Sequence, residues 1–286
     1  MIRLDFESIR KEFLDVYASV RNLSDEDILR GSGWDFGASY EGLAQLGAIL
    51  VTEQLASNIL ANSRFRQTAK RLGHIVSLLE QRRELDYAEL VCTSTAPLAC
   101  LKSLPSYPVY SQEVEMEVGA SGVGASDTLL FLGSGPFPFS LILYARKHCV
   151  RGIGVERNAH FAEISRKVVL ALGLEGQIRI VHGDHFSLAR LPECTLTIIA
   201  HQAEPKEEIF AQLFSVVDDG ARIAYRTLDD GAGEDLNLGA VLRRAQLLEQ
   251  SAEASAGAYG FKEILRVRPA PPVVTSFVLS LKEVKR

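Results

Sequence analysis

The segment from Thr128 to Ser140 constrains the fold more than any other part of the chain. It begins with four apolar residues, Leu129 to Leu132, which predict a buried strand. A Gly133-Ser134-Gly135 turn follows, and an amphipathic helix is predicted after it. Glycines let a backbone approach a ligand closely, and a helix start presents unpaired N–H groups. The segment is therefore typical of the first loop of a nucleotide-binding α/β fold.

Composition and charge exclude several classes of protein. The 286 residues fit one large domain or two smaller ones, and 47% hydrophobic against 23% charged residues predicts a globular protein with ample core. A net charge of −5 argues against a nucleic-acid-binding surface. No apolar leader or 18-residue uncharged apolar stretch occurs, so we expect a cytoplasmic protein without a membrane span. The four cysteines show no metal-binding spacing and are predicted to be buried small apolar side chains.

Residues 1–118 are predicted to form an all-helical N-terminal domain. Ser24 to Asp27 form a candidate capping box that opens a short second helix. Three further helices are indicated by apolar faces: Phe6, Ile9, Phe13 and Val16; Leu43, Leu46, Leu50 and Val51; and Leu72, Ile75, Leu78 and Leu79, the last continuing toward Val91. A segment rich in Ser, Thr and Pro at 93–110 interrupts the helical pattern, and 119–124 is the best linker candidate.

From Asp127 onward, short apolar runs alternate with helical segments. Strands are predicted at 129–132, 152–155, 178–181, 196–200 and 222–225, and helices at about 137–148, 158–172, 205–217 and 237–250. This alternation indicates a parallel sheet. Two final strands, 261–267 and 274–281, leave no room for a helix and should pair antiparallel. Residues 119–286 are therefore predicted to form a Rossmann-like domain of the class I type that binds S-adenosylmethionine.

Further residues lie where a nucleoside ligand needs them. Glu156 follows Gly135 by 21 residues and ends the second strand, next to Arg157, where a carboxylate can accept both ribose hydroxyls. Asp184 ends the third strand, where it can take the adenine amino group while Phe186 packs on the ring. The predicted cofactor site comprises Gly133, Ser134, Gly135, Pro136, Glu156, Arg157, Asp184, His185, Phe186, Ala200 and His201.

Each of these signals is weak alone, and their order and spacing together carry the prediction. NAD is disfavoured because the third glycine of a dinucleotide-binding loop is missing after Gly133 and Gly135. His182, His185 and His201 cluster at predicted strand ends, but their spacing matches no standard metal motif. No metal site is therefore predicted.

The loop from Gly133 to Pro138 resembles that of the nicotianamine synthase family, which includes bacterial enzymes that make staphylopine- and pseudopaline-like metallophores. In that family the loop is Gly-Ser-Gly-Pro-Leu-Pro or close to it. Tyr107-Pro-Val-Tyr110 is similar to the family's Phe-Pro-Tyr-Tyr segment, and the strand ending in Arg226-Thr227 is similar to its fifth strand. The organisation of a helical domain followed by a methyltransferase-like domain also matches.

The resemblance implies transfer of the 3-amino-3-carboxypropyl (aminobutyrate) group of S-adenosylmethionine to an amine, with release of methylthioadenosine. By resemblance, Tyr110 belongs to the active site; Tyr107, which stands where the family has Phe, is a further catalytic candidate. Glu89, with Glu84 as the reserve choice, supplies the family's helical glutamate. Arg226 matches a strand-five arginine that would pair with a substrate carboxylate. The alternatives are that the tyrosines only pack between domains, the glutamates are solvated, and Arg226 closes a structural ion pair.

Three functions remain open from the sequence. The first is an aminobutyrate transferase of metallophore (opine-type) biosynthesis acting on a small amino-acid acceptor, with histidine favoured by analogy. The second is an ordinary S-adenosylmethionine-dependent methyltransferase acting on a small molecule, and the third is a nucleotide-binding partner protein without turnover. The coproduct separates the first two. A homodimer is compatible with the sequence.

Overall fold

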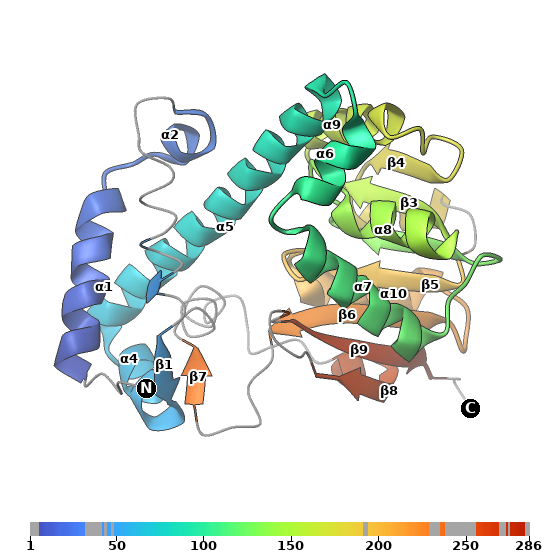
Figure 1. Cartoon of the computed structure of the whole chain (residues 1–286). Helices are drawn as coiled ribbons and strands as arrows, with labels where there is room; N and C mark the ends of the chain where they lie inside the picture. The colour runs from blue at the N-terminus through green and yellow to red at the C-terminus, as the bar shows by residue number, and fades with distance from the viewer. Residues whose placement is uncertain are drawn as a thin grey trace. The chain divides into compact units, whose positions relative to one another are not determined.

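The chain forms two compact units in the computed structural model (Figure 1). The structure describes residues 6–31, 42, 45–46, 49–190, 194–228, 235–237, 256–268, 273 and 275–283. Unit 1 comprises residues 1–83 and 229–253, and unit 2 comprises residues 84–228 and 254–286. The boundary falls between Arg83 and Glu84, inside one continuous helix, and the chain returns to unit 1 after the fifth parallel strand. The sequence analysis placed its boundary at the 119–124 segment instead.

Unit 1 is built from helices with one small sheet. Its described elements are α1 (Phe6–Val20), α2 (Asp25–Arg30), β1 (Leu50–Thr52), α4 (Glu53–Ala61), the first part of α5 (Ser63–Thr93) and β7 (Asp235–Asn237). The predicted apolar face of α1 is confirmed, because Ile9 and Phe13 are fully buried in the core of this unit. The predicted continuation of the fourth helix toward Val91 is also confirmed, because α5 extends to Thr93.

The third predicted helix is wrong at its end. Leu50 and Val51 lie in β1, which pairs antiparallel with β7, so these apolar residues fill a strand instead of a helical face. The partner strand lies almost two hundred residues further along the chain, where no local pattern reveals it. Thr52 then caps α4 by accepting a hydrogen bond from the backbone N–H of Leu55. Leu43 and most of the helix predicted at 237–250 lie outside the described residues.

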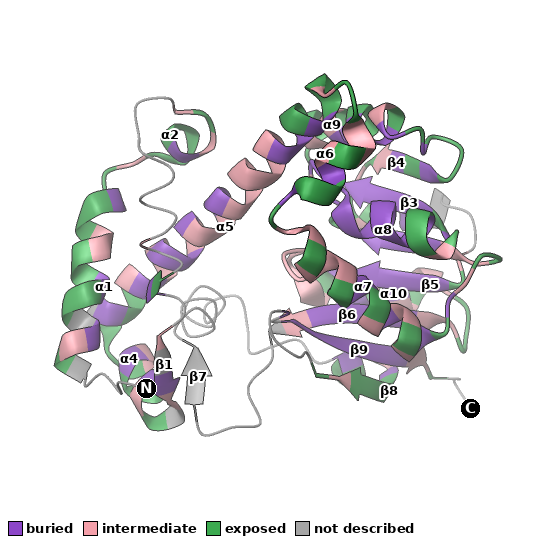
Figure 2. Ribbon diagram, in the orientation of Figure 1, coloured by how far each residue is buried: buried purple, intermediate pink, exposed green. Residues whose placement is uncertain are grey.

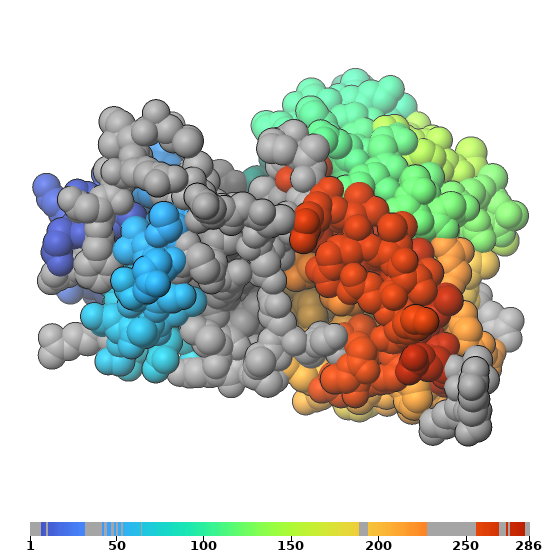
Figure 3. All heavy atoms as spheres, turned by 90° about the horizontal axis from the view of Figure 1, so that it is seen from below, coloured from blue at the N-terminus to red at the C-terminus, as the bar shows by residue number. Residues whose placement is uncertain are grey.

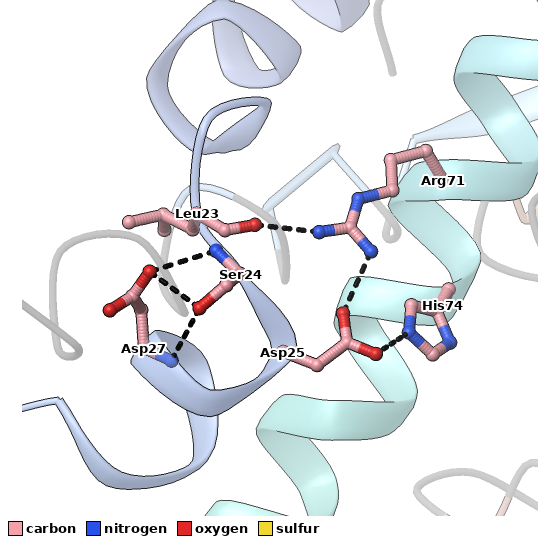
Figure 4. A network of polar contacts seen from close by, with 6 residues as sticks. All are labelled: Leu23, Ser24, Asp25, Asp27, Arg71 and His74. Atoms are coloured by element: carbon pink, nitrogen blue, oxygen red, sulfur yellow. Dashed lines mark hydrogen bonds and ion pairs between the residues drawn. The ribbon is translucent and has the colours of Figure 1, made fainter.

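Polar contacts join α2 to α5 (Figure 4). The capping box is confirmed: Ser24 Oγ accepts from the N–H of Asp27, whose carboxylate accepts in turn from the N–H of Ser24. Asp25 in the first turn bridges two residues of α5, with Arg71 Nη1 at 3.0 Å and His74 Nε2 at 2.7 Å. Arg71 also donates to the carbonyl of Leu23 over 2.7 Å. Two successive turns of α5 thus hold the start of α2.

We expect Asp25→Asn to destabilise unit 1 only slightly, by less than about 1 kcal/mol, because the bridge is half exposed and screened by solvent. Hydrogen bonds from His74 and Arg71 lower the pKa of Asp25 from its usual value of 3.8. Its contribution is therefore present above pH 3.8 and is lost as the pH falls through the lowered pKa. Chemical denaturation at low and at 1 M salt measures the effect, and a loss that does not shrink at 1 M salt would contradict it.

Unit 2 contains a seven-stranded sheet of order β4-β3-β2-β5-β6-β9-β8. Its strands are β2 (Thr128–Leu132), β3 (Arg151–Glu156), β4 (Ile178–His182), β5 (Leu196–Ile199), β6 (Arg222–Leu228), β8 (Phe261–Val267) and β9 (Thr275–Lys282). β2 to β6 pair parallel, while β9 pairs antiparallel with both β6 and β8. The predicted Rossmann-like sheet with an antiparallel tail is therefore confirmed.

Helices cover both faces of this sheet. The helices of unit 2 are the end of α5, α6 (Pro97–Ser103), α7 (Tyr107–Ser121), α8 (Phe139–His148), α9 (Ala159–Ala171) and α10 (Lys206–Val216), with 3-10 turns η1 (His185–Arg190) and η2 (Ala256–Tyr259). Alternate residues of each strand enter two cores, so that Phe131 packs with α7, α8 and α9 while Leu130 packs with α10 and η1. Figure 2 shows β2, β3 and β5 almost wholly buried.

β8 forms an exposed edge of the sheet and is visible in Figure 3. Five consecutive residues from Lys262 to Arg266 are exposed. The pairing of β8 with β9 has a register shift between Glu263 and Leu265. Arg266 and Glu263, which form a salt bridge at 2.9 Å, place charges along the edge. Bulges and charges of this kind discourage pairing with another strand.

Two local predictions are wrong. The 119–124 segment is not a free linker, because α7 continues to Ser121 and ends at Gly122, which takes φ of +68° in a left-handed cap. Cys92 and Cys149 are exposed, whereas Cys100 and Cys194 are half-buried. Their small apolar side chains were expected inside, but helix C-terminal positions place the first two outside.

None of the described helices combines the length and apolar composition of a membrane-spanning segment.

Candidate functional site

The predicted glycine loop lies at the point where the strand order of the sheet reverses. β2 pairs with β3 on one side and β5 on the other, so their carboxyl ends meet at one edge. The N–H of Gly133 donates to the carbonyl of Val155 over 2.9 Å, and that of Ala200 donates to Leu132 over 3.0 Å. Ligands of open α/β sheets bind outside the carboxyl ends of strands at such a reversal.

Both glycines of the loop are required by its geometry. Gly133 and Gly135 have φ of +80° and +69°, a backbone region that residues with a Cβ rarely adopt. A Cβ on Gly133 would lie 3.1 Å from the Cβ of Ala203, after the end of β5. A Cβ on Gly135 would lie 2.6 Å from a carboxylate oxygen of Glu84. The second glycine therefore lets an acidic side chain of α5 reach the loop.

Glu156 connects the loop to the end of β3. One carboxylate oxygen accepts from the N–H of Gly135 over 3.0 Å, and the other accepts from the N–H of Asn158 over 2.8 Å. The side chain is only 7% exposed. A carboxylate offers about four lone-pair sites, so each oxygen can still accept a second hydrogen bond. This orientation is compatible with the predicted contact to two ribose hydroxyls.

Ser134 is buried beneath the loop, and its Oγ has no hydrogen-bond partner among the described residues. The loop packs there against Gly154 in β3, where a Cβ would lie 2.9 Å from Cβ of Ser134 and 2.9 Å from Cδ1 of Ile180. Gly154 therefore makes room for the loop. Sequence analysis did not single out this glycine, because a glycine inside a strand has no local signature of what approaches it.

We expect Gly154→Ala to destabilise unit 2 by about 1–3 kcal/mol, because the added methyl group overpacks the underside of the loop. Gly119→Ala is the matched control: nothing lies within 4 Å of its Cβ position, and alanine favours the helix. Chemical denaturation of both variants measures the difference. Equal stabilities of the two variants would show that the loop moves without cost.

The end of β4 carries the residues predicted to recognise adenine. Asp184 is exposed, and its Oδ1 accepts from the N–H of Phe186 over 2.9 Å, so it caps η1. Phe186 is 61% exposed, and its ring centroid lies 4.2 Å from that of His185. His185 Nε2 lies 3.4 Å from a carboxylate oxygen of Glu208 in α10. The capping role that a strand-end carboxylate often plays is thus present, and Phe186 offers an uncovered aromatic face.

The end of β5 approaches the same edge. Ala200 is half-buried beside Gly133, and the carbonyl of His201 accepts from Lys206 Nζ over 2.8 Å. Lys206 also contacts Glu204 at 3.0 Å. Arg157, exposed after β3, donates to the carbonyl of Glu204 over 3.2 Å. These bonds fasten the turn after β5 to the turn after β3.

Aromatic rings surround the proline-rich half of the loop. Tyr110 stacks on Phe139, with ring centroids 4.5 Å apart and planes 7° apart. Tyr107 lies 6.3 Å from the same ring, Phe137 lies 5.0 Å from it, and Tyr87 of α5 meets Phe137 edge-on at 6.1 Å. The structure thus brings the Tyr107–Tyr110 segment to the loop, although the two are separated by more than twenty residues. The part played by Phe137 and Phe139 was not predicted.

The two candidate glutamates of α5 differ in surroundings. Glu84 is half-buried, and its carboxylate occupies the space where a Cβ on Gly135 would lie. Glu89 is exposed, and its backbone carbonyl accepts from the hydroxyl of Thr93. Five residues along a helix turn the side chain through well over a quarter of a revolution. The position of Glu84, the reserve choice, therefore favours it over Glu89 as the candidate active-site glutamate.

Arg226 in β6 is buried within acidic side chains. It contacts Glu113 at 2.9 Å and Glu117 at 2.7 Å, and it donates to Ser140 Oγ over 2.9 Å. Burial lowers the pKa of Arg226, but the charges of Glu113 and Glu117 outweigh this and raise it above its usual value. Arg226 therefore makes the structural ion pair that the sequence left open, and its contact to a substrate carboxylate stays a prediction. Its two acidic partners lie over a hundred residues away in the sequence, where no motif connects them to Arg226.

The described part of the chain brings no three His, Cys, Asp or Glu side chains together as a metal site.

Comparison with solved structures shows the fold. MtNAS in complex with MTA and tNA has 23% identity and a TM-score of 0.77, with 99% of each chain covered. A glutamate-to-glutamine variant of MtNAS in complex with S-adenosylmethionine has 22% identity and a TM-score of 0.75, covering 99% of this chain and 100% of the other.

A more distant likeness is to the mitomycin 7-O-methyltransferase MmcR, with 14% identity, a TM-score of 0.50, and 96% and 94% of the two chains covered. No curated protein matches the chain. The family model described as nicotianamine synthase protein matches residues 4–286, nearly the whole sequence. With the Gly133–Pro138 loop, the tyrosine segment and the sheet topology all present, the chain belongs to the nicotianamine synthase family.

Proposed function

We propose that this protein transfers the aminobutyrate group of S-adenosylmethionine to the amine of an amino-acid acceptor and releases methylthioadenosine. Family membership supports the reaction class, and the similar protein MtNAS binds S-adenosylmethionine in one structure and MTA in another. The observation that carries the proposal here is the approach of Glu84 to Gly135. A carboxylate at that loop can take a proton from an acceptor amine bound there.

The residues at the strand ends fit the donor substrate. Glu156, with lone pairs remaining on both oxygens, would accept from the ribose hydroxyls. Asp184 and the exposed ring of Phe186 would hold the adenine, and Gly133 and Gly135 let the backbone approach closely. Ser134 offers a buried hydroxyl without a partner among the described residues.

Glu84 would act as the general base. The acceptor amine of a free amino acid is mostly protonated at pH 7, and Glu84 takes one proton to free its lone pair. That lone pair forms a bond to the terminal carbon of the aminobutyrate arm, while the carbon–sulfur bond breaks and its electron pair stays on sulfur. The sulfonium becomes the neutral thioether of methylthioadenosine. The product amine carries the positive charge until it releases a proton.

Tyr107 and Tyr110 would orient the acceptor. Both hydroxyl-bearing rings are half-buried against Phe139 at the loop, in the same unit as Glu84. Because any carbon attached to a sulfonium is electrophilic, the carbon held in line with the amine is the one that reacts. We propose that the rigid Pro136 and Pro138, which offer no N–H, shape this alignment.

Mass spectrometry of the reaction mixture tests the proposal. The protein is incubated with S-adenosylmethionine and a panel of amino acids that includes both enantiomers of histidine, the acceptor we favour for a nicotianamine-like metallophore. We expect methylthioadenosine together with an acceptor that is heavier by one aminobutyrate unit. S-adenosylhomocysteine as the sole coproduct would establish the alternative, a methyltransferase.

A further inference from the structure

A buried ionic cluster lies behind the aromatic rings of the loop. Its centre is Arg226, whose Nε and Nη2 donate to the two carboxylate oxygens of Glu117 over 2.7 and 2.9 Å. Nη1 contacts Glu113 at 2.9 Å. The hydroxyl of Tyr144 donates to Glu117 over 2.7 Å, and the hydroxyl of Thr275 donates to Glu113. We call these residues, with Ser140, the Arg226 cluster.

The Arg226 cluster joins four elements of unit 2: Glu113 and Glu117 from α7, Ser140 and Tyr144 from α8, Arg226 from β6 and Thr275 from β9. All six residues are less than 9% exposed. The guanidinium also lies 5.2 Å from the ring centroid of Phe131 in β2. The cluster therefore fixes two helices to the centre and the tail of the sheet.

The same two helices present the stacked pair at the loop. Tyr110, Glu113 and Glu117 recur at intervals of three and four residues and share one face of α7. On α8, Phe139 directly precedes Ser140, which accepts from Arg226 over 2.9 Å. The stacking of Tyr110 on Phe139, at 4.5 Å and 7°, is thus set by two helices that one guanidinium holds.

Stability alone does not account for such a cluster. The cluster has two acidic side chains for one guanidinium, so its charges are not matched. Apolar residues of similar volume often stabilise a core equally well. A planar guanidinium bonded at fixed angles to a carboxylate supplies orientation that apolar packing lacks. Rings that must align a substrate within a fraction of an ångström benefit from this.

We propose that Arg226, Glu113 and Glu117 are positioning residues that hold Tyr110 in register with Phe139 for the transfer reaction. This rests on the proposed function, because Tyr110 is given a role in acceptor alignment there. The cluster does not touch Glu156 or Asp184, the groups proposed to hold the donor. Loosening it should therefore slow turnover more than it weakens donor binding.

Arg226→Lys tests this, since lysine keeps the charge but not the planar fork. We expect kcat for methylthioadenosine release to fall about tenfold or more, with the Kd for S-adenosylmethionine, measured by calorimetry, changing less than about threefold. Arg222→Lys is the matched control. Arg222 lies four residues earlier on β6 and also bonds α7, but through the carbonyl of Ser121 at the far end of the helix. It should retain kcat.

A double-mutant cycle with Tyr110→Phe separates positioning from general loosening. If the cluster acts through Tyr110, the double variant Tyr110→Phe with Arg226→Lys should lose about as much kcat as the more damaging of the two single variants. Fully additive losses, or a Kd that weakens as much as kcat falls, would overturn the proposal. Ser140→Ala, which removes only one hydrogen bond, serves as a gentler variant and should lower kcat a few fold in the same direction.

Hydrogen exchange keeps the inference testable even if the wild type releases no methylthioadenosine, the result that would refute the proposed function. Amides of residues 109–114 should exchange faster in Arg226→Lys than in the wild type or Arg222→Lys, while those of α9 stay unchanged. Unchanged exchange at 109–114 would overturn the positioning role, whatever the activity.

Discussion

Glu84→Gln is expected to lower the rate of aminobutyrate transfer by about 10²–10⁴, the range typical of a lost general base. Glutamine keeps the size and hydrogen-bonding capacity of the side chain but cannot take the acceptor's proton. Donor binding should change little, because the proposed ribose and adenine contacts come from β3 and β4. Single-turnover release of methylthioadenosine, with calorimetric binding of S-adenosylmethionine alongside, measures both quantities.

Glu89→Gln is the control, since Glu89 lies on the same helix but is exposed and forms no described contact with the loop through its side chain. It should retain nearly the full rate. The two glutamates are thus ranked by experiment in a way that the sequence motif does not allow. If Glu89→Gln is slow and Glu84→Gln is active, the general base is Glu89, and the role inferred for Glu84 from its position beside Gly135 is wrong.

Arg226→Met is expected to destabilise unit 2 by about 3–5 kcal/mol, because Glu113 and Glu117 would then be buried without a counter-charge. Burial, reinforced by the charge of Glu117, already raises the pKa of Glu113 above its usual value of 4.5, although Arg226 opposes this. Removing the guanidinium raises that pKa further. Chemical denaturation at neutral pH gives the free energy of unfolding.

The pH dependence of this loss has a definite sign. A carboxyl group whose pKa is raised on folding contributes stability that is present below pH 4.5 and is lost as the pH rises through the raised value. The deficit of Arg226→Met should therefore shrink as the pH falls from 8 toward 5, and adding Glu113→Gln should recover part of it at pH 8. A deficit that is independent of pH would indicate that lost packing, not unpaired charge, causes it.

The sequence predicts the sheet well because its strands are marked locally. The runs at Leu129–Leu132 and Leu196–Ile199 are continuous apolar segments bounded by polar or glycine-containing turns, as strands buried on both faces require. The two-strand tail was predictable because no helix fits between its members. Gly133 and Gly135 were recognisable because a turn with left-handed backbone selects glycine.

What failed depends on partners that are distant in the sequence. Leu50 and Val51 form a strand only because residues 235–237 pair with them. Arg226 matched a motif, but the two glutamates that engage it belong to a helix that the Pro- and Ser-rich segment concealed. Glu84 and Glu89 are both ordinary helical glutamates, and only the folded position of Gly135 distinguishes them.

Gly135 has a consequence for redesign of this enzyme. Its N–H donates to Glu156, and the space of its missing side chain is filled by the Glu84 carboxylate. If the proposed roles hold, recognition of the donor and activation of the acceptor are linked through one backbone position. A change of acceptor is therefore better sought at Tyr107, whose ring lies against Phe139, than in the loop, where altering one function would disturb the other.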